Sequence, residues 1–239
     1  MGQAIRSGLI GSGNFVSDDF LLSNSKNDNK KVVRRADIVI FAVKPDDLFD
    51  ILDDVKSFLL GEKLLISVVA RTSICDIQKH LGFSCQIVRI MPNICASVRE
   101  SMSCWVKSDK VNASNAKKVK FILESFGKEI MLDDEDLFGV VTVISASGPA
   151  FFLYLAELLD NFSRDVGLEP KISKSLIKQT ILGVSKLLLE SDKTITSRRE
   201  EIMSKGGTTE AVFQKLNENR FDKIFLEALK SGYKRASGK

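Results

Sequence analysis

The sequence predicts an α/β domain followed by an all-helical domain. Up to residue 132, short apolar runs alternate with segments of helical spacing, which is typical of a parallel sheet covered by helices. From residue 133 onward the spacing is helical and shows no convincing strand. The length of 239 residues, 44% of them hydrophobic, allows two such domains, which we place at residues 1–132 and 133–239.

The elements of the first domain follow from the spacing of its apolar residues. Ile5 and Leu9 lie four positions apart, which suits a short helix over residues 1–10. The run 36–43 is apolar on both faces, as in a strand of a parallel sheet. Polar residues 23–31 are expected to form a turn-rich connection. Further predicted strands cover residues 20–22, 64–70, 85–90, 102–106 and 128–132, and further predicted helices cover residues 46–60, 73–81 and 114–126.

The second domain is predicted to consist of helices alone. The predicted helices cover residues 134–144, 148–166, 172–191, 196–203, 208–217 and 221–235. Two apolar stripes exceed what a short helical domain buries, and they run through Phe151, Leu155 and Leu158, and through Ile177, Ile181, Val184 and Leu188. Helices 148–166 and 172–191 are therefore expected to pack against a second subunit.

Composition argues against several classes of protein. The 35 Lys and Arg residues against 31 Asp and Glu give a net charge of +4 that is spread along the chain, so we expect no nucleic-acid partner. The cysteines form no CxxC pair and His80 is the single histidine, so we expect the reduced thiols of a cytoplasmic protein and no zinc site. We expect no stretch with the length and apolarity of a membrane span, and hence no membrane partner.

Three predicted strands end in loops that could line a ligand crevice. Lys44 follows the strand 36–43, and residues 68–70 and 91–93 end two other strands. Ligands of open α/β sheets bind at the carboxyl ends of strands, and the residue before a proline continues in an extended conformation. An ordinary strand end with a solvent-exposed lysine is an equally good interpretation of these residues alone. The segment Gly11-Ser12-Gly13 is a weaker candidate for phosphate binding, because it follows a predicted helix and lacks a third glycine.

A glycine-rich segment, Ser204-Lys205-Gly206-Gly207-Thr208-Thr209-Glu210, links two predicted helices. Its glycines free the backbone, and unpaired N–H groups at the start of the next helix would suit an anion such as a carboxylate. From these residues alone, a plain helix cap is slightly favoured over an anion site.

Together these motifs resemble the pyrroline-5-carboxylate reductase family. The matching segments occur in the family's order and are residues 1–5, 42–45, 89–93, 145–150, 181–183, 186–191 and 204–209. The resemblance implies reduction of 1-pyrroline-5-carboxylate to proline, the last step of proline biosynthesis, by a cytoplasmic homodimer or higher homo-oligomer. It also implies a Rossmann-like sheet domain followed by a helical dimerisation domain.

The resemblance implies site residues position by position. NADPH or NADH is expected to lie against Asn29, Ala42, Val43, Lys44, Pro45, Val68, Val69, Ala70 and Glu135. The substrate is expected to bind at Gly206, Gly207, Thr208 and Thr209. Thr209 and Ser204 are the expected catalytic residues, with the Thr209 hydroxyl at the ring nitrogen while a hydride passes from the nicotinamide to the imine carbon.

The chain departs from the family at several places. In the family, a strand and a Gly-x-Gly-Asn turn precede the position of Met1, so the first strand of the sheet is expected to be missing and cofactor binding to be weak. Arg71 and Ala146 replace glycines, and Lys205 replaces a proline.

Two alternatives to the reductase remain. One is a dehydrogenase of the 3-hydroxyacid type, for which Lys174, Lys178 or Lys186 could serve as the catalytic lysine. The other is a non-enzymatic, truncated relic that forms a helical dimer.

Overall fold

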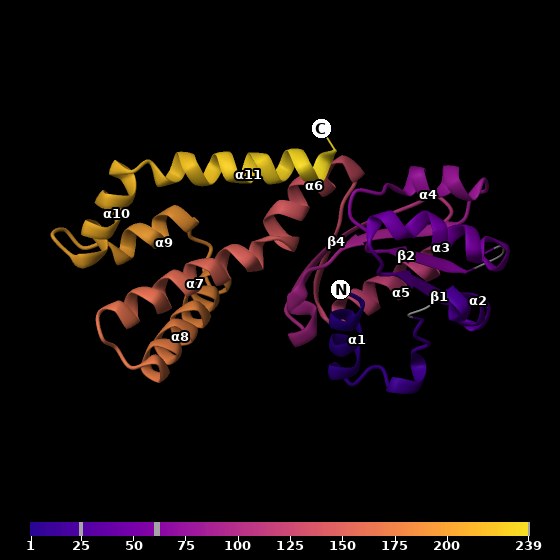
Figure 1. Cartoon of the computed structure of the whole chain (residues 1–239), viewed down its shortest axis with the longest axis horizontal. Helices are drawn as coiled ribbons and strands as arrows, with labels where there is room; N and C mark the ends of the chain where they lie inside the picture. Colours follow the sequence, from indigo (N-terminus) through magenta and orange to yellow (C-terminus); the bar gives the residue numbers. More distant parts are fainter. Residues whose placement is uncertain (24–25, 60–62, 239) are drawn as a thin grey trace. The chain divides into compact units, whose positions relative to one another are not determined.

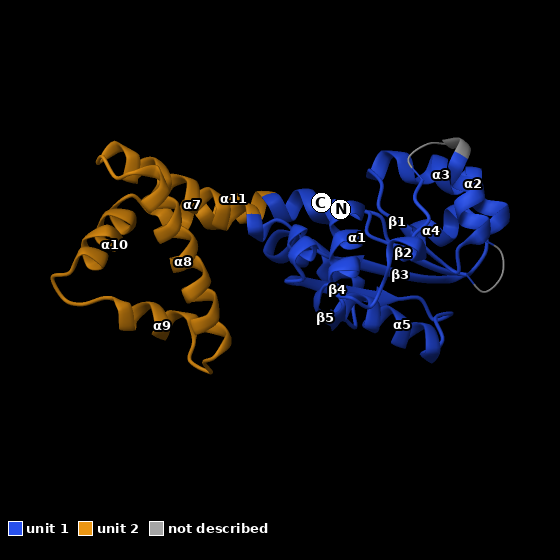
Figure 2. Ribbon diagram, turned by 90° about the horizontal axis from the view of Figure 1, so that it is seen from below, with its two compact units in different colours: residues 1–149, 232–239 blue, residues 150–231 orange. Residues whose placement is uncertain are grey.

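The computed structural model describes residues 1–23, 26–59 and 63–238 (Figure 1). It contains two compact units, one of residues 1–149 with 232–239, and the other of residues 150–231 (Figure 2). The domain boundary predicted between residues 132 and 133 therefore falls within the first unit and stays a prediction. The predicted fold class, an α/β domain followed by helices only, is confirmed.

A five-stranded sheet forms the centre of the first unit. Its strands, in the order in which they pair, are β1 (Ile38–Phe41), β2 (Leu64–Ser67), β3 (Gln86–Met91), β4 (Ser101–Lys107) and β5 (Gly127–Met131). The first three strands are parallel, but β4 runs antiparallel to β3, with Ile90 opposite Trp105, and β5 is parallel to β4. The expectation of a wholly parallel sheet is wrong here, because residues 92–100 are too short a connection for the dozen or more residues that a parallel crossover needs.

Helices cover both faces of this sheet. They are α1 (Gly2–Gly11), α2 (Lys26–Arg35), α3 (Leu48–Val55), α4 (Ile74–Leu81) and α5 (Ala113–Glu124). The side chains of β2 alternate between two cores: Leu65 packs with residues of α3 and α4, whereas Leu64 and Ile66 pack with residues of α1 and α5. This alternation produces a three-layer arrangement, as expected for strands buried on both faces.

The segment before β1 differs from its prediction. Residues 20–22 form no strand, because no neighbouring strand pairs with them among the described residues. The expected connection 23–31 contains the first half of α2, in which Asp28 lies in the first turn and Arg34 and Arg35 in the last, a charge order that favours a helix. Residues 24 and 25 lie outside the described residues. In β1 only Val39 and Phe41 are buried, since this strand lies at one edge of the sheet.

Helix α1 lies unusually close to its neighbours. A Cβ atom added to Gly8 would lie 2.1 Å from the backbone oxygen of Ala96 and 2.7 Å from Cβ of Phe126. At the start of the helix, a Cβ on Gly2 would lie 3.2 Å from that of Ala42, just after β1. These contacts hold the N-terminal end of α1 beside the carboxyl end of β1.

Short helical segments connect the sheet to the second unit. Residues Glu135–Leu137, α6 (Phe138–Val141) and a π-helical turn at Thr142–Ala146 precede α7 (Gly148–Asp165). The remaining helices are α8 (Pro170–Leu189), α9 (Ile195–Ile202), α10 (Thr208–Glu218) and α11 (Phe221–Ser237), each close to its predicted range. The last turns of α11 belong to the first unit, where Tyr233 lies against Gly139.

A polar cluster fastens α7 to α8. The buried Ser173 hydroxyl donates to Asp160 Oδ1 at 2.8 Å and accepts from the Ser163 hydroxyl at 2.6 Å. The Ser173 hydroxyl, followed by the Arg164 guanidinium, holds the pKa of the Asp160 carboxyl below its usual value. The second unit is thus ordered by internal contacts, although few of its side chains are buried.

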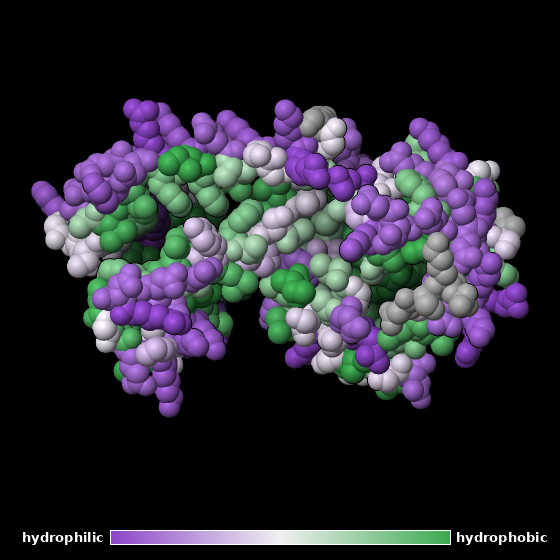
Figure 3. Space-filling view, viewed as in Figure 1, coloured by the Kyte–Doolittle hydropathy of each residue, from purple (hydrophilic) through white to green (hydrophobic). Residues whose placement is uncertain are grey.

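Many large apolar side chains of the second unit are exposed, and on the face seen in Figure 3 hydrophobic areas lie among hydrophilic ones. More than half of the following side chains is exposed: Phe152, Leu153, Tyr154, Leu159, Phe162, Val166, Leu176, Leu189, Ile195, Ile202, Val212, Ile224 and Leu226. The stripe residues Leu155, Leu158, Ile181, Val184 and Leu188 are 40–46% exposed. Apolar surface of this extent marks a site of association.

Among the described residues, one helical stretch is long and apolar enough to cross a membrane, namely residues 135–165. This corrects the expectation that no stretch has these properties. The cause is that α6, the π-helical turn and α7 continue as one helical run, where two shorter helices are predicted. A helix whose apolar side chains pack against another subunit meets the same criterion, so the stretch agrees with the association surface described above.

The four cysteines are free thiols that differ in access, and we expect them to react at different rates. Burial raises the pKa of Cys85 to about 11 and also raises that of Cys104, whereas Cys75 is exposed. Because the thiolate is the reacting form, a maleimide should modify Cys75 in the native protein and reach Cys85 and Cys104 only after unfolding. Mass spectrometry of labelled peptides measures this, with denatured protein as the control; equal native rates would contradict it.

Candidate functional site

A cavity of about 720 Å³ lies beside β1, at the edge of the sheet. Its lining comes from the start of α1, the segment 18–23, one face of α2, and β1 with the two residues that follow it. Three predicted cofactor residues, Asn29, Ala42 and Val43, are among them. The structure therefore brings together residues that are up to fourteen positions apart in the sequence. They lie near the carboxyl end of β1, and ligands of open α/β sheets bind at the carboxyl ends of strands.

Residues 42–45 and residues 68–70, which were predicted to line a crevice, follow the neighbouring strands β1 and β2 and lie side by side. The Val68 N–H donates to the Phe41 carbonyl oxygen at 3.1 Å, which joins the end of β2 to the end of β1. Lys44 is exposed and extended, with φ −68° and ψ 149°, as the following Pro45 requires. The residues at 42–45 and 68–70 thus share one rim. Val69 is buried, so in that segment only the half-buried Val68 and Ala70 have side chains at the surface.

Arg71 follows this rim in a left-handed backbone conformation, with φ 60°. Such a conformation favours glycine, which explains why glycine is the usual residue at this position in the family that the sequence resembles. In this chain an exposed arginine occupies the position and adopts this strained conformation.

Three cavity residues that the sequence analysis did not select lie at the start of α1, namely Met1, Gly2 and Gln3. The first N–H groups of a helix have no partner within the helix, and the helix dipole favours an anion there. Arg6 also lines the cavity, and its buried Nε has no hydrogen-bond partner among the described residues. The resemblance of residues 1–5 to the family was the sequence signal that could have identified these residues as part of the site. The segment from Gly11 to Gly13 lies at the other end of α1.

Asn29 is held by a neighbour from the segment before α2. The Ser23 hydroxyl donates to Asn29 Oδ1 at 2.6 Å, so the two side chains lie together at the cavity wall. Ser23 was not selected from the sequence, because a serine in a polar segment carries no signal of its own.

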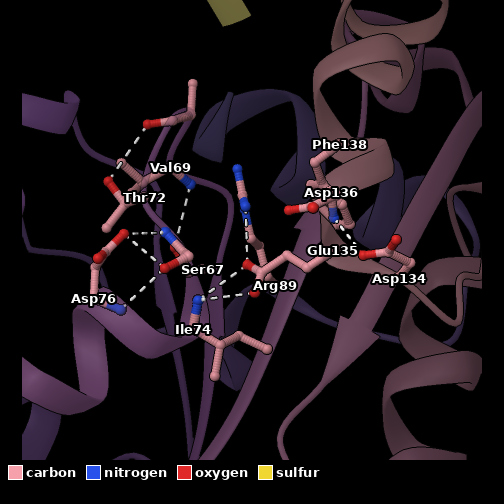
Figure 4. Close-up of polar contacts among 12 residues, drawn as sticks. Ser67, Val69, Thr72, Ile74, Asp76, Arg89, Asp134, Glu135, Asp136 and Phe138 are labelled. Atoms are coloured by element: carbon pink, nitrogen blue, oxygen red, sulfur yellow. Dashed lines mark hydrogen bonds and ion pairs between the residues drawn. The ribbon is translucent and has the colours of Figure 1, made fainter. Parts of the chain in front are cut away.

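Glu135 is not among the residues that line this cavity, and it lies in a cluster of polar contacts with Arg89 and Ile74 (Figure 4). Its carboxylate accepts from Arg89 Nη1 at 2.9 Å and from the Ile74 N–H, at the start of α4, at 3.0 Å. The Arg89 side chain is only 8% exposed, and its guanidinium lies over the Phe138 ring, 4.4 Å from the ring centroid. Sequence reasoning missed Arg89, although a charged residue in the middle of an apolar strand was a usable signal.

Helix α4 receives a second set of capping contacts from its own sequence. The Asp76 N–H donates to the Ser73 hydroxyl oxygen at 3.0 Å, while Asp76 Oδ2 accepts from the Ser73 N–H and hydroxyl. The hydroxyl contact, followed by the N–H contact, lowers the pKa of the Asp76 carboxyl. Glu135 thus adds a carboxylate to a helix start that is already capped, which ties residues 133–138 to the sheet.

The glycine-rich segment lies in the second unit, between α9 and α10. Gly206 has φ 74°, a left-handed conformation that favours glycine, and a Cβ on Gly207 would lie 2.5 Å from Ser204 Oγ and 3.0 Å from the Ser204 carbonyl oxygen. The Gly207 N–H already donates to the Ser204 carbonyl oxygen at 3.0 Å, and the Gly206 N–H donates to Glu210 Oε2 at 2.7 Å. Within the described part of the chain, the N–H groups of Thr208 and Thr209 have no acceptor.

Comparisons with known proteins match both the first and the last part of the chain to family models. Residues 135–239 match the family model described as pyrroline-5-carboxylate reductase dimerisation, and residues 1–71 match the model described as NADP oxidoreductase, coenzyme F420-dependent. A pyrroline-5-carboxylate reductase of Staphylococcus haemolyticus is 31% identical over 253 residues, which cover 99% of this chain and 93% of that protein. Pyrroline-5-carboxylate reductase 2 of Bacillus subtilis is 29% identical over 99% of this chain and 91% of its own length.

A solved structure is also similar over the whole chain. It is the crystal structure of a Plasmodium falciparum pyrroline carboxylate reductase with NADP bound, which has a TM-score of 0.91 and 27% sequence identity. The similarity covers 100% of this chain and 94% of that one.

Proposed function

The chain belongs to the pyrroline-5-carboxylate reductase family, and we propose on this basis that it reduces 1-pyrroline-5-carboxylate to proline with NADPH or NADH. The observation that carries the proposal is the 31% identity to one such reductase across nearly the full length of both chains. The glycine-rich segment at 204–209 supports the reductase over a 3-hydroxyacid dehydrogenase.

The cavity beside β1 fits a dinucleotide cofactor. Its volume of about 720 Å³ is in the range of small-molecule sites, and the unpaired N–H groups of α1 and the unpartnered Nε of Arg6 suit phosphate groups. We place the cofactor between α1, Asn29 and the rim at 42–45 and 68–70. When bound, the reduced nicotinamide supplies the hydride that the imine carbon takes up.

The substrate carboxylate is placed at the start of α10. Because the N–H groups of Gly206 and Gly207 are bonded within the loop, we assign the carboxylate to the free N–H groups of Thr208 and Thr209. The helix dipole favours an anion at this point. The Thr209 hydroxyl is assigned to the ring nitrogen, where it orients the imine, and Ser204 supports the loop through its carbonyl oxygen. Glu135 does not line the cavity beside β1, so the cofactor role that the resemblance implies is proposed to be indirect, through its contacts with Arg89 and the start of α4.

The chain forms homo-oligomers through its helical domain, and we propose that the basic unit is a homodimer. The exposed stripes on α7 and α8 would be covered by the same helices of a second copy, which makes a self-complementary interface. The proposed location is the cytoplasm, which the four free thiols support.

Breaking the stripes should separate the subunits. Leu155→Lys combined with Ile181→Lys places two charges on surfaces that the interface would bury, and we expect the particle mass in light scattering to fall to that of one chain. Val98→Lys is the matched control, since Val98 is an exposed apolar residue of the first unit, and it should leave the mass unchanged. A wild-type protein that is a folded monomer at micromolar concentration would contradict the homodimer.

The activity is tested by a direct assay. Purified full-length protein is mixed with pyrroline-5-carboxylate and either NADPH or NADH, and both cofactor oxidation and proline formation are measured. Stoichiometric formation of proline supports the proposed function. Oxidation of a 3-hydroxyacid with NAD⁺ in place of this reaction would favour the dehydrogenase, and Lys174, Lys178 and Lys186 on α8 would then be the residues to replace.

Thr209→Ala should lower kcat/KM for pyrroline-5-carboxylate about ten- to a hundredfold while leaving cofactor affinity nearly unchanged. The reason is that a hydrogen bond to a charged group contributes roughly 1.5–3 kcal/mol, and each 1.4 kcal/mol is about tenfold. Lys44→Ala should instead disturb cofactor binding. If Thr209→Ala weakened NADPH and left the substrate kinetics alone, the two sites would be assigned the wrong way round. No effect of either change would make the glycine-rich segment a helix cap only.

A further inference from the structure

We infer that Glu210 is a positioning residue that locks the glycine-rich loop so that the free N–H groups of α10 can receive the substrate carboxylate. This inference rests on the proposed function and adds a residue that the site did not include. It starts from one contact, the 2.7 Å hydrogen bond from the Gly206 N–H to Glu210 Oε2.

The contact differs from an ordinary capping box. Gly207 is the N-cap of α10 and has no side chain to cap the helix, and Glu210 occupies the third helical position. A glutamate at this position usually reaches back to the N–H of the N-cap residue. Here that N–H already donates to the Ser204 carbonyl oxygen, so the Glu210 carboxylate reaches one residue further, to Gly206.

The loop needs this restraint because of its glycines. Gly206 adopts φ 74°, and apart from its chain neighbours no described residue has an atom within 4 Å of the place where its Cβ would be, so side-chain packing does not hold it. Glycine loses more conformational freedom on ordering than any other residue. Two hydrogen bonds, from Gly206 to Glu210 and from Gly207 to Ser204, therefore fix the backbone that leads into the free N–H groups of Thr208 and Thr209.

Charge gives Glu210 a second, opposing effect that makes the inference testable. A carboxylate at the start of α10 repels an anionic substrate, and a residue there with no positioning role would only weaken substrate binding. Replacement by glutamine keeps an acceptor oxygen for the Gly206 N–H and removes the charge, whereas alanine removes both. The positioning role therefore predicts a higher KM for the alanine variant but not for the glutamine variant.

The experiment compares Glu210→Ala, Glu210→Gln and the wild-type full chain in the pyrroline-5-carboxylate assay. We expect alanine to raise KM for the substrate about tenfold, the size expected for the loss of one hydrogen bond to a charged group, with little change in kcat or in KM for the cofactor. Glutamine should restore KM to the wild-type value or below it. Glu218→Ala is the matched control, because Glu218 is an exposed glutamate at the other end of α10.

Amide hydrogen exchange tests the contact independently of activity. Exchange of the Gly206 N–H should be faster in Glu210→Ala than in the wild type, and nearly as slow in Glu210→Gln. An active wild type with unchanged KM in both variants would overturn the inference, as would a KM lowered in both, which indicates repulsion alone. A wild type that forms no proline would overturn the proposed function, and unchanged exchange of the Gly206 amide would separately overturn the positioning role.

Discussion

Glu135→Ala is expected to lower the free energy of unfolding by roughly 3 kcal/mol. Removal of one partner of a buried ion pair leaves the other charge without compensation, which costs about 3–5 kcal/mol. The lower end applies because Glu135 keeps 26% of its side chain in contact with water, while Arg89 keeps 8%. The variant also removes the acceptor of the Ile74 N–H at the start of α4. Urea denaturation of the purified protein measures the change.

Two further variants separate charge from shape at this cluster. Glu124→Ala is the control, since Glu124 forms an exposed ion pair with Lys120 and its loss should cost less than about 1 kcal/mol. The double variant Arg89→Met with Glu135→Leu should recover most of the lost stability, because apolar residues of similar size can replace a buried pair. If Glu135→Ala were no more harmful than Glu124→Ala, the cluster would not stabilise the first unit.

Gly8→Ala should destabilise the protein by about 3 kcal/mol or more. The added Cβ would lie 2.1 Å from the Ala96 backbone oxygen, and a backbone atom cannot move aside as a side chain does. Helix α1 would have to shift away from residues 94–98, and its N-terminal end would leave the end of β1 with it. We therefore expect a lower midpoint in thermal unfolding together with weaker NADPH binding.

Gly11→Ala is the matched control in the same helix. A Cβ on Gly11 would meet only the Arg99 side chain, at 3.9 Å. Alanine favours a helix by up to about 1 kcal/mol over glycine, so this change should leave stability unaltered or raise it. Equal effects of the two substitutions would show that the close approach of α1 to Ala96 is not what limits position 8.

Much of the fold was predictable because its core is periodic. The buried strands β2 and β3 and the helices α3 and α4 follow directly from apolar spacing. Strand direction does not follow from an apolar run, which reads the same both ways. The short connection before β4 was the usable signal, and β4 was assigned to a parallel sheet without it. Helix α2 was missed because its face toward the core rests mainly on Val33, within a segment that is otherwise strongly polar.

The candidate site was predictable in part, from local sequence features and from resemblance to the family. The rim residues were selected because a strand end followed by Pro45 is a local feature, and resemblance to the family supplied Asn29 and Thr209. Arg89 pairs with Glu135 across 46 positions of sequence, and Glu210 was given no role beyond its place in the motif. Contacts of this kind depend on tertiary packing or on an exact loop conformation, neither of which periodicity contains. The roles of the predicted site residues stay predictions until the variants are measured.

The return of α11 to the first unit has a consequence for synthesis on the ribosome. Residues 1–149 emerge first, yet the last turns of α11, including Tyr233 and Ser237 against Gly139, belong to the same unit. The sheet can form while the helices of residues 150–231 are still being translated, because all five strands precede them. Packing around Gly139 is completed only after residue 237 has left the exit tunnel. Until then Tyr233 and Ser237 cannot contact Gly139, so the first unit is completed only at the end of translation.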